Sequence, residues 1–235
     1  MAVDMTHAID SPIATRFVAG LGFRRGLCDE RPMPPAASVI HTTGSGPISR
    51  FLREGKRKGD DSPFDTAVRI YATIMQDSAH YVVGQLGQCV QVVPEALSAR
   101  HVGGAGNAVY ARPRARWMTA GLRWWGERWP ELESPHALAG GLLWRDGSCN
   151  RSSIGVEVVP PLAGARGPWS PECWATLARL TLDIADRHGI PVDREHVVTH
   201  SDAHPASRSA RGAPWDPGPA AWSWERMRSA IASGA

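Results

Sequence analysis

The chain has 235 residues, of which 43% are hydrophobic and 21% charged, and its formal net charge is +3. These are globular values that allow one compact domain with a sizeable core and do not require a second domain. Lys and Arg are scattered, and the densest basic run, residues 53–59, is typical of a solvated loop. The composition therefore argues against a nucleic-acid-binding protein.

Residues 1–36 are expected to form an N-terminal extension, packed on the domain or partly mobile, because prolines interrupt them at positions 12, 32, 34 and 35. The apolar stretch 17–23 is too short for a secretory signal, and the first residues carry acid rather than base. No apolar run reaches transmembrane length. We therefore expect a chain made in the cytoplasm, without a signal peptide or an integral membrane segment.

The main domain is expected to cover residues 37–235. It begins with a short buried strand over 37–41, whose last residue, His41, emerges at a sheet edge. Residues 63–75 then carry apolar side chains at helical spacing, and Ser62 stands where a helix cap is expected.

Two short apolar runs, H-Y-V-V-G and Q-C-V-Q-V-V-P, lie on either side of a turn around Gly87. This pattern predicts a β-hairpin, with His80 as one of its buried residues. A further apolar run over residues 153–159 predicts a buried strand.

The clearest helix signal starts at Ser170, followed by proline, and extends to about His188, with Gly189 in the position that ends a helix. Residues 196–200 predict a last strand. A final helix contains Trp222, Trp224 and Met227. Strands and helices therefore occur in the mixed order of an α/β fold.

Residues 105–150 are unusually rich in tryptophan. Met118, Leu122, Trp125 and Trp129 recur at the spacing of one helical face. The segment predicts a helical insertion that either packs on the domain or forms a groove wall whose aromatic rings stack on a sugar or a partner.

The four cysteines contain no C-x-x-C pair, so a cysteine zinc site is not expected. Cys89 falls in a predicted strand and Cys173 in a predicted helix. Both are expected to fill the core rather than to form a disulfide.

Two histidines and an aspartate, far apart in the sequence, are candidate zinc ligands: His41 in V-I-H-T-T-G, His200 in V-V-T-H-S-D and Asp216 in W-D-P-G-P. Two imidazoles and a carboxylate would leave the fourth tetrahedral position open for water, as in catalytic zinc sites. Glu157, in S-I-G-V-E-V-V, lies on an apolar strand where a lone carboxylate has no packing role. The four residues together indicate a zinc hydrolase.

Order and local context strengthen this hypothesis, because from about Val39 to Pro219 the chain resembles the zinc-dependent N-acetylmuramoyl-L-alanine amidases related to peptidoglycan recognition proteins. Five segments carry the resemblance in the family's order: H-T-T-G, the hairpin S-A-H-Y-V-V-G-Q-L-G-Q-C-V-Q-V-V-P-E, A-R-H-V-G-G, S-I-G-V-E-V, and the pair H-S-D-A-H-P and D-P-G-P. The resemblance implies a central mixed β-sheet flanked by helices in a single domain.

The resemblance also implies roles for individual residues. His41, His200 and Asp216 are the expected ligands of Zn²⁺, and Glu157 is the expected proton acceptor and donor. The expected contacts to substrate are His101 and Thr42. The family hydrolyses the amide between the lactyl group of N-acetylmuramic acid and L-alanine of the stem peptide.

One position departs from the family. Catalytic members often carry a lysine two residues before the ligand aspartate, where this chain has Pro214. We expect Arg211, or else Arg208, to supply the missing positive charge to the oxyanion from a longer loop. The alternative is that both arginines are solvated and zinc alone stabilises the oxyanion.

Three functions remain open at this point. The leading one is a peptidoglycan amidase, acting on the cell wall as a phage-type lysin or tail-associated hydrolase, or remaining cytosolic as a muropeptide-recycling enzyme. The second is a peptidoglycan recognition module that binds without cutting, and the third is hydrolysis of another amide on the same fold. The expected partner is peptidoglycan or a muropeptide, and the expected oligomeric state is a monomer.

Overall fold

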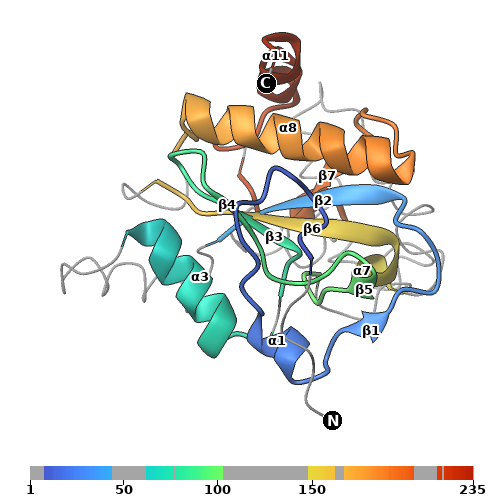
Figure 1. Ribbon diagram of the computed structural model, residues 1–235. Helices are drawn as coiled ribbons and strands as arrows, with labels where there is room; N and C mark the ends of the chain where they lie inside the picture. Colours follow the sequence, from blue (N-terminus) through green and yellow to red (C-terminus); the bar gives the residue numbers. More distant parts are fainter. Residues whose placement is uncertain are drawn as a thin grey trace, which may run out of the picture.

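The computed structural model describes residues 8–43, 62–76, 78–102, 148–161, 167–203, 216–218 and 220–234 (Figure 1). The predicted tryptophan-rich insertion lies almost entirely outside the described residues. Arg208, Arg211 and Pro214 also lie outside them.

A five-stranded mixed sheet forms the centre of the molecule (Figure 1). The spatial order of its strands is β4 (Cys89–Gln91), β3 (Tyr81–Val83), β6 (Ser153–Val158), β2 (Ala37–Thr42) and β7 (Val197–Thr199). The last four run parallel to one another, and β4 is antiparallel to β3. The hairpin predicted around Gly87 is confirmed, and this glycine has the positive φ of 77° that the turn requires.

One face of the sheet is covered by α8 (Pro171–His188), on which α11 (Trp224–Ala232) packs (Figure 1). Helix α8 begins where the sequence predicts, since Ser170 Oγ accepts a hydrogen bond from the Cys173 amide, and ends at Gly189 with φ 65°. Its apolar stripe packs on the even-numbered side chains of β2 and β6; the shared core includes Ile40, Ile154, Val156, Leu177, Leu180 and Ile184.

The opposite face carries α3 (Pro63–Thr73), which Ser62 caps by accepting a hydrogen bond from the Asp65 amide. Phe64 and Ala67 of α3 pack on Val82 and Val90 in a second core cluster. The odd-numbered side chains of β2 and β6, which include His41 and Glu157, point to this face, because side chains alternate along a strand.

The segment before β2 is packed on the domain. Its backbone runs along β4, with hydrogen bonds from the Thr15, Val18 and Gly20 amides to carbonyls of residues 89–92. It continues through α1 (Leu21–Arg24) to β1 (Asp29–Glu30), which pairs antiparallel with β5 (Leu97–Ser98). The division into an extension over 1–36 and a domain over 37–235 stays a prediction.

Two short helices adjoin the sheet: α7 (Cys149–Ser152) leads into β6, and α9 (His200–Ala203) follows β7.

All four cysteines are free, and Cys89 and Cys173 are buried as predicted. Among the described helices, none has the length and apolar character needed to span a membrane.

Candidate active site

The site lies where the parallel strands β2, β6 and β7 end. His41 of β2 is the register partner of Glu157 of β6, and Ile40 is the partner of Thr199 on the other side. His200, the next residue after β7, therefore comes next to His41. The carboxyl ends of parallel strands are the usual location of active sites in α/β sheets.

His200 does not end the last strand, as the sequence suggested, but begins α9. Thr199 Oγ1 accepts a hydrogen bond from the Asp202 amide at 3.0 Å, and Asp202 Oδ2 accepts one from the Thr199 amide at 2.8 Å. These reciprocal bonds form a capping box, whose signal T-x-x-D is present in the sequence. The cap turns the chain sharply after Thr199 and directs His200 into the site.

His41, His200 and Asp216 form a buried group that can hold a metal ion. Their candidate ligand atoms all lie within 4.8 Å of one another. Asp216 Oδ2 is 3.0 Å from His200 Nδ1 and 3.5 Å from His41 Nδ1. Two ligands at about 2.0–2.1 Å from a tetrahedral zinc ion are about 3.4 Å apart, so this nitrogen and oxygen donor set fits Zn²⁺.

Asp216 is held from both sides. The Thr42 amide donates to its Oδ1 at 2.5 Å, while Ser201 Oγ accepts from the Asp216 amide at 2.9 Å. Burial disfavours the charged form of Asp216, but its interactions with the His200 and His41 rings hold the pKa of its carboxyl well below the usual range. The residue is therefore ionised, as a metal ligand must be.

Glu157 lies beside this group and is oriented by two hydroxyl groups. Thr43 Oγ1 donates to Glu157 Oε2 at 3.0 Å, and the buried Tyr71 of α3 also hydrogen-bonds to the carboxylate. Burial raises the pKa of Glu157, and the negative charge of Asp216 adds to the rise, whereas His41 and the two hydroxyl groups act in the opposite direction. A carboxylate with a raised pKa can both accept and return a proton.

His101 lies on the other side of His41. Its Nδ1 is 3.0 Å from His41 Nε2, the two rings meet edge to face, and only 8% of the residue is exposed. Burial, followed by the neighbouring His41, holds the pKa of His101 well below its usual value, so the ring is neutral.

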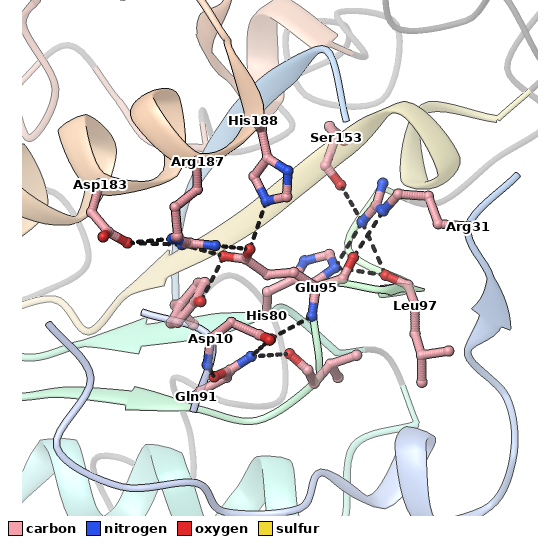
Figure 2. Close-up of polar contacts among 12 residues, drawn as sticks. Asp10, Arg31, His80, Gln91, Glu95, Leu97, Ser153, Asp183, Arg187 and His188 are labelled. Atoms are coloured by element: carbon pink, nitrogen blue, oxygen red, sulfur yellow. Dashed lines mark hydrogen bonds and ion pairs between the residues drawn. The ribbon is translucent and has the colours of Figure 1, made fainter. Parts of the chain in front are cut away.

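A second neutral histidine, His80, lies edge to face against His101. It borders a buried ionic network that includes Arg31 (Figure 2). His80 Nδ1 accepts from the Gly155 amide at 2.9 Å, and its Nε2 lies 3.0 Å from the Leu97 carbonyl. Burial and the adjacent Arg31 lower the pKa of His80 to about 3. The guanidinium of Arg31 donates to five backbone carbonyls, those of Glu95, Leu97, Asn150, Arg151 and Ser153.

The structure thus brings together six of the eight residues that the sequence indicated for the site: His41, Thr42, His101, Glu157, His200 and Asp216. Arg208 and Arg211 lie outside the described residues. Three contributing residues were not predicted: Thr43, Tyr71 and Ser201. The signal for Tyr71 was weak but present, because the hydroxyl of a buried tyrosine usually finds a hydrogen-bond partner.

Comparison with known proteins gives a family match and a similar fold. The family model described as N-acetylmuramoyl-L-alanine amidase matches residues 31–219. No curated protein matches the chain. Among solved structures, a selenomethionine derivative of AmpD is similar over 98% of this chain and 99% of its own, with 19% identity and a TM-score of 0.50. That likeness supports the fold.

Two further structures are similar at lower TM-scores. AmpD of Citrobacter freundii shares 20% identity, covers 98% of this chain and 97% of its own, and has a TM-score of 0.46. A mutant endolysin from Bacillus subtilis shares 16% identity, covers 92% of this chain and 96% of its own, and has a TM-score of 0.47. Since the family model matches most of the sequence, the chain belongs to the N-acetylmuramoyl-L-alanine amidase family.

Proposed function

We propose that the protein is a zinc-dependent N-acetylmuramoyl-L-alanine amidase that hydrolyses the amide between the lactyl group of N-acetylmuramic acid and L-alanine. The observation that carries the proposal is the buried group of His41, His200 and Asp216, with Glu157 one strand away. Family membership supports the amidase activity, and the nitrogen and oxygen donor set supports zinc.

His41, His200 and Asp216 would hold the metal, and three protein ligands leave a fourth position open. A zinc ion in such a site supplies Lewis acidity toward the scissile carbonyl and lowers the pKa of a bound water to about 7. From outside the ligand set, the Thr42 amide holds the Asp216 carboxylate and Ser201 holds the Asp216 backbone. Such outer partners orient ligands and maintain metal affinity.

Glu157 would accept the proton of the attacking water and pass it to the departing amine of L-alanine. Its raised pKa favours both acceptance of the proton from water and its later donation to the amine. Thr43 and Tyr71 fix the direction of the carboxylate, so that one geometry serves for both proton acceptance and donation.

A positive side chain beside the metal would add to the stabilisation of the oxyanion. We propose that Arg211, or else Arg208, supplies it in place of the lysine that many relatives carry at the position of Pro214. Replacing each arginine by alanine and measuring turnover tests this assignment. Wild-type turnover in both variants would contradict it without affecting the metal assignment.

Digestion of purified peptidoglycan tests the reaction. The expected products are new L-alanine amino termini on intact glycan strands, and a chelator should abolish their release until zinc is restored. Cut glycan strands or cut cross-bridges would contradict the proposal. Binding to peptidoglycan with no new termini, by zinc-loaded protein, would identify a recognition module instead.

Polymeric cell wall and small anhydro-muropeptides present the same amide. Turnover on isolated sacculi compared with turnover on purified anhydro-muropeptide separates a lytic role at the wall from a recycling role in the cytosol. Light scattering of the purified protein tests the expectation that it is a monomer.

A further inference from the structure

We propose that Ser153 and His101 form a hydrogen-bond relay that keeps the proton of His41 on Nε2 and thereby leaves His41 Nδ1 unprotonated for the metal. The proposal rests on the zinc site proposed above and assigns His101 a positioning role. The relay begins on β6, two positions before Gly155, and ends at the ligand.

The first step is the hydroxyl group of Ser153, which is fully buried. Ser153 Oγ donates its proton to the Cys149 carbonyl at 2.7 Å. A hydroxyl has one proton, so toward His101 Nε2, at 3.3 Å, it acts as the acceptor. The proton of the neutral His101 ring therefore lies on Nε2.

The second step follows from the two nitrogens of His101. With Nε2 protonated, Nδ1 carries a lone pair and accepts from His41 Nε2 at 3.0 Å. His41 then holds its proton on Nε2. Its Nδ1 faces Asp216 Oδ2 at 3.5 Å, inside the ligand group.

The opposite arrangement is disfavoured by the same contacts. A proton on His101 Nδ1 would make His101 Nε2 an acceptor, and Ser153 would have to leave the Cys149 carbonyl to donate to it. His41 Nε2 would then accept the hydrogen bond from His101 Nδ1. A neutral His41 would then carry its proton on Nδ1, where it blocks metal binding.

The position of the His101 ring is set by contacts with Asn150 and Gly155. Asn150 Oδ1 accepts from the amides of His101 and Val102, at 3.2 and 2.8 Å, and Asn150 Nδ2 donates to the Val102 carbonyl at 3.0 Å. On the sheet side, a Cβ at Gly155 would lie 2.4 Å from His101 Cγ. The ring therefore rests directly on the glycine backbone, which explains how it comes close enough to bind both Ser153 and His41.

The tautomers are measured directly by nitrogen-15 NMR of the histidine rings. In the metal-free wild-type protein, His101 should show a protonated Nε2 and an unprotonated Nδ1. A His101 protonated on Nδ1 would overturn the relay. This measurement needs neither zinc nor activity.

Zinc affinity, measured by competition with a chromogenic chelator, gives the second readout. His101→Leu removes the acceptor and should weaken zinc binding about 10- to 100-fold, the usual effect of losing an outer partner of a ligand histidine. His101→Asn, whose side-chain oxygen can accept near the position of Nδ1, should restore part of the affinity.

Ser153→Ala should weaken zinc binding and broaden or mix the tautomers of His101. The matched control is Ser152→Ala, since the adjacent hydroxyl is equally buried and makes no hydrogen bond within the described part of the chain. Equal zinc affinity in the two alanine variants would overturn the relay. Thermal unfolding in chelator identifies any variant that has lost its fold.

The outcomes separate this proposal from the proposed function. A wild-type protein that binds no zinc would contradict the zinc amidase, while the tautomer of His101 would still decide the relay. Conversely, a wild-type protein that binds zinc and cleaves the amide, with His101 protonated on Nδ1, would support the function and overturn the relay.

Discussion

His41 and Glu157 are register partners on the neighbouring parallel strands β2 and β6. Neighbouring strands are about 4.8 Å apart, so backbone hydrogen bonds of the sheet set the distance between the candidate ligand and the candidate proton acceptor. Both side chains point to the face that carries α3, and Tyr71 of that helix bonds to Glu157. The hydrogen-bonded register of the sheet therefore positions both candidate groups.

Glu157→Gln should retain zinc but lose turnover by about 10²- to 10⁴-fold, because the amide cannot accept the proton of the attacking water. Release of L-alanine amino termini and zinc content, measured on the same preparation, check this expectation. Glu225→Gln, an exposed change on α11, is the control and should behave like wild type. An active Glu157→Gln variant would remove this residue from the mechanism.

Asp216→Asn should reduce the stabilisation that zinc gives to the folded protein. A ligand at a hundredfold excess over its dissociation constant stabilises the native state by about 2.7 kcal/mol. Loss of the carboxylate charge weakens zinc binding, so the same zinc concentration should stabilise the folded variant less than the wild-type protein. Thermal unfolding with zinc and with chelator measures the difference. The control is Asp186→Asn, an exposed change on α8, which zinc should stabilise as much as the wild-type protein.

Local signals predicted the elements that build the fold. Helix α8 has a serine cap, a proline in its first turn, an apolar stripe and a terminal glycine, and each of these works within a few residues. The hairpin depended on Gly87 in the same local way. The ligand group followed from motifs in a known order, and its three residues do come together.

What the sequence did not predict depends on contacts between distant segments. Tyr71 occupies a position on an apolar helical stripe, and only the packing of α3 on the sheet brings its hydroxyl to Glu157. Arg31 was part of a segment interpreted as an extension, yet its guanidinium bonds to carbonyls up to 122 residues away. No periodicity reports such long-range hydrogen bonds.

Gly155→Ala should destabilise the protein by about 1–3 kcal/mol, the usual cost of overpacking a buried position. The added Cβ would lie 2.4 Å from His101 Cγ, so the ring must move. Denaturant unfolding without metal measures the cost. In the double variant Gly155→Ala/His101→Ala, the two effects should be clearly less than additive, because the second change removes the clash. Simple additivity would contradict this explanation.

Arg31→Lys should destabilise the protein by about 2–5 kcal/mol, although the charge is kept. A lysine has three donors on one nitrogen and cannot reach the five carbonyls that the planar guanidinium of Arg31 bridges. Figure 2 shows Leu97 and Ser153 among these partners. Arg16→Lys is the control, because Arg16 is exposed and its side chain forms a single ion pair among the described residues, with Asp65 at 3.5 Å, so the change should cost less than about 1 kcal/mol. Similar costs for both variants would contradict the bridging role of Arg31.

The free energy of unfolding should fall as the pH is lowered from about 6.5, because His80 is held neutral in the folded state. Burial lowers the pKa of His80 to about 3, whereas an unfolded histidine titrates near about 6.5. Between these values the unfolded state binds more protons, so stability increases with pH by about 1.4 kcal/mol per unit from this residue. His101, also buried and neutral, adds a slope of the same sign.

Urea unfolding between about pH 5 and pH 7 measures this slope, and this window lies above the range in which Glu95 titrates. Glu157, whose pKa is raised by burial, contributes a slope of the opposite sign, so the contribution of His80 is taken from the comparison with a variant that keeps Glu157. Burial raises the pKa of Glu95, but hydrogen bonds from Arg187, His188 and Tyr81 hold it well below the usual value, so its stabilisation is lost only in stronger acid. His80→Asn keeps an acceptor for the Gly155 amide and removes the titrating ring. The variant should be less stable at neutral pH because of the smaller side chain, yet its stability should depend less steeply on pH. An unchanged slope would show that His80 is not the group that resists protonation.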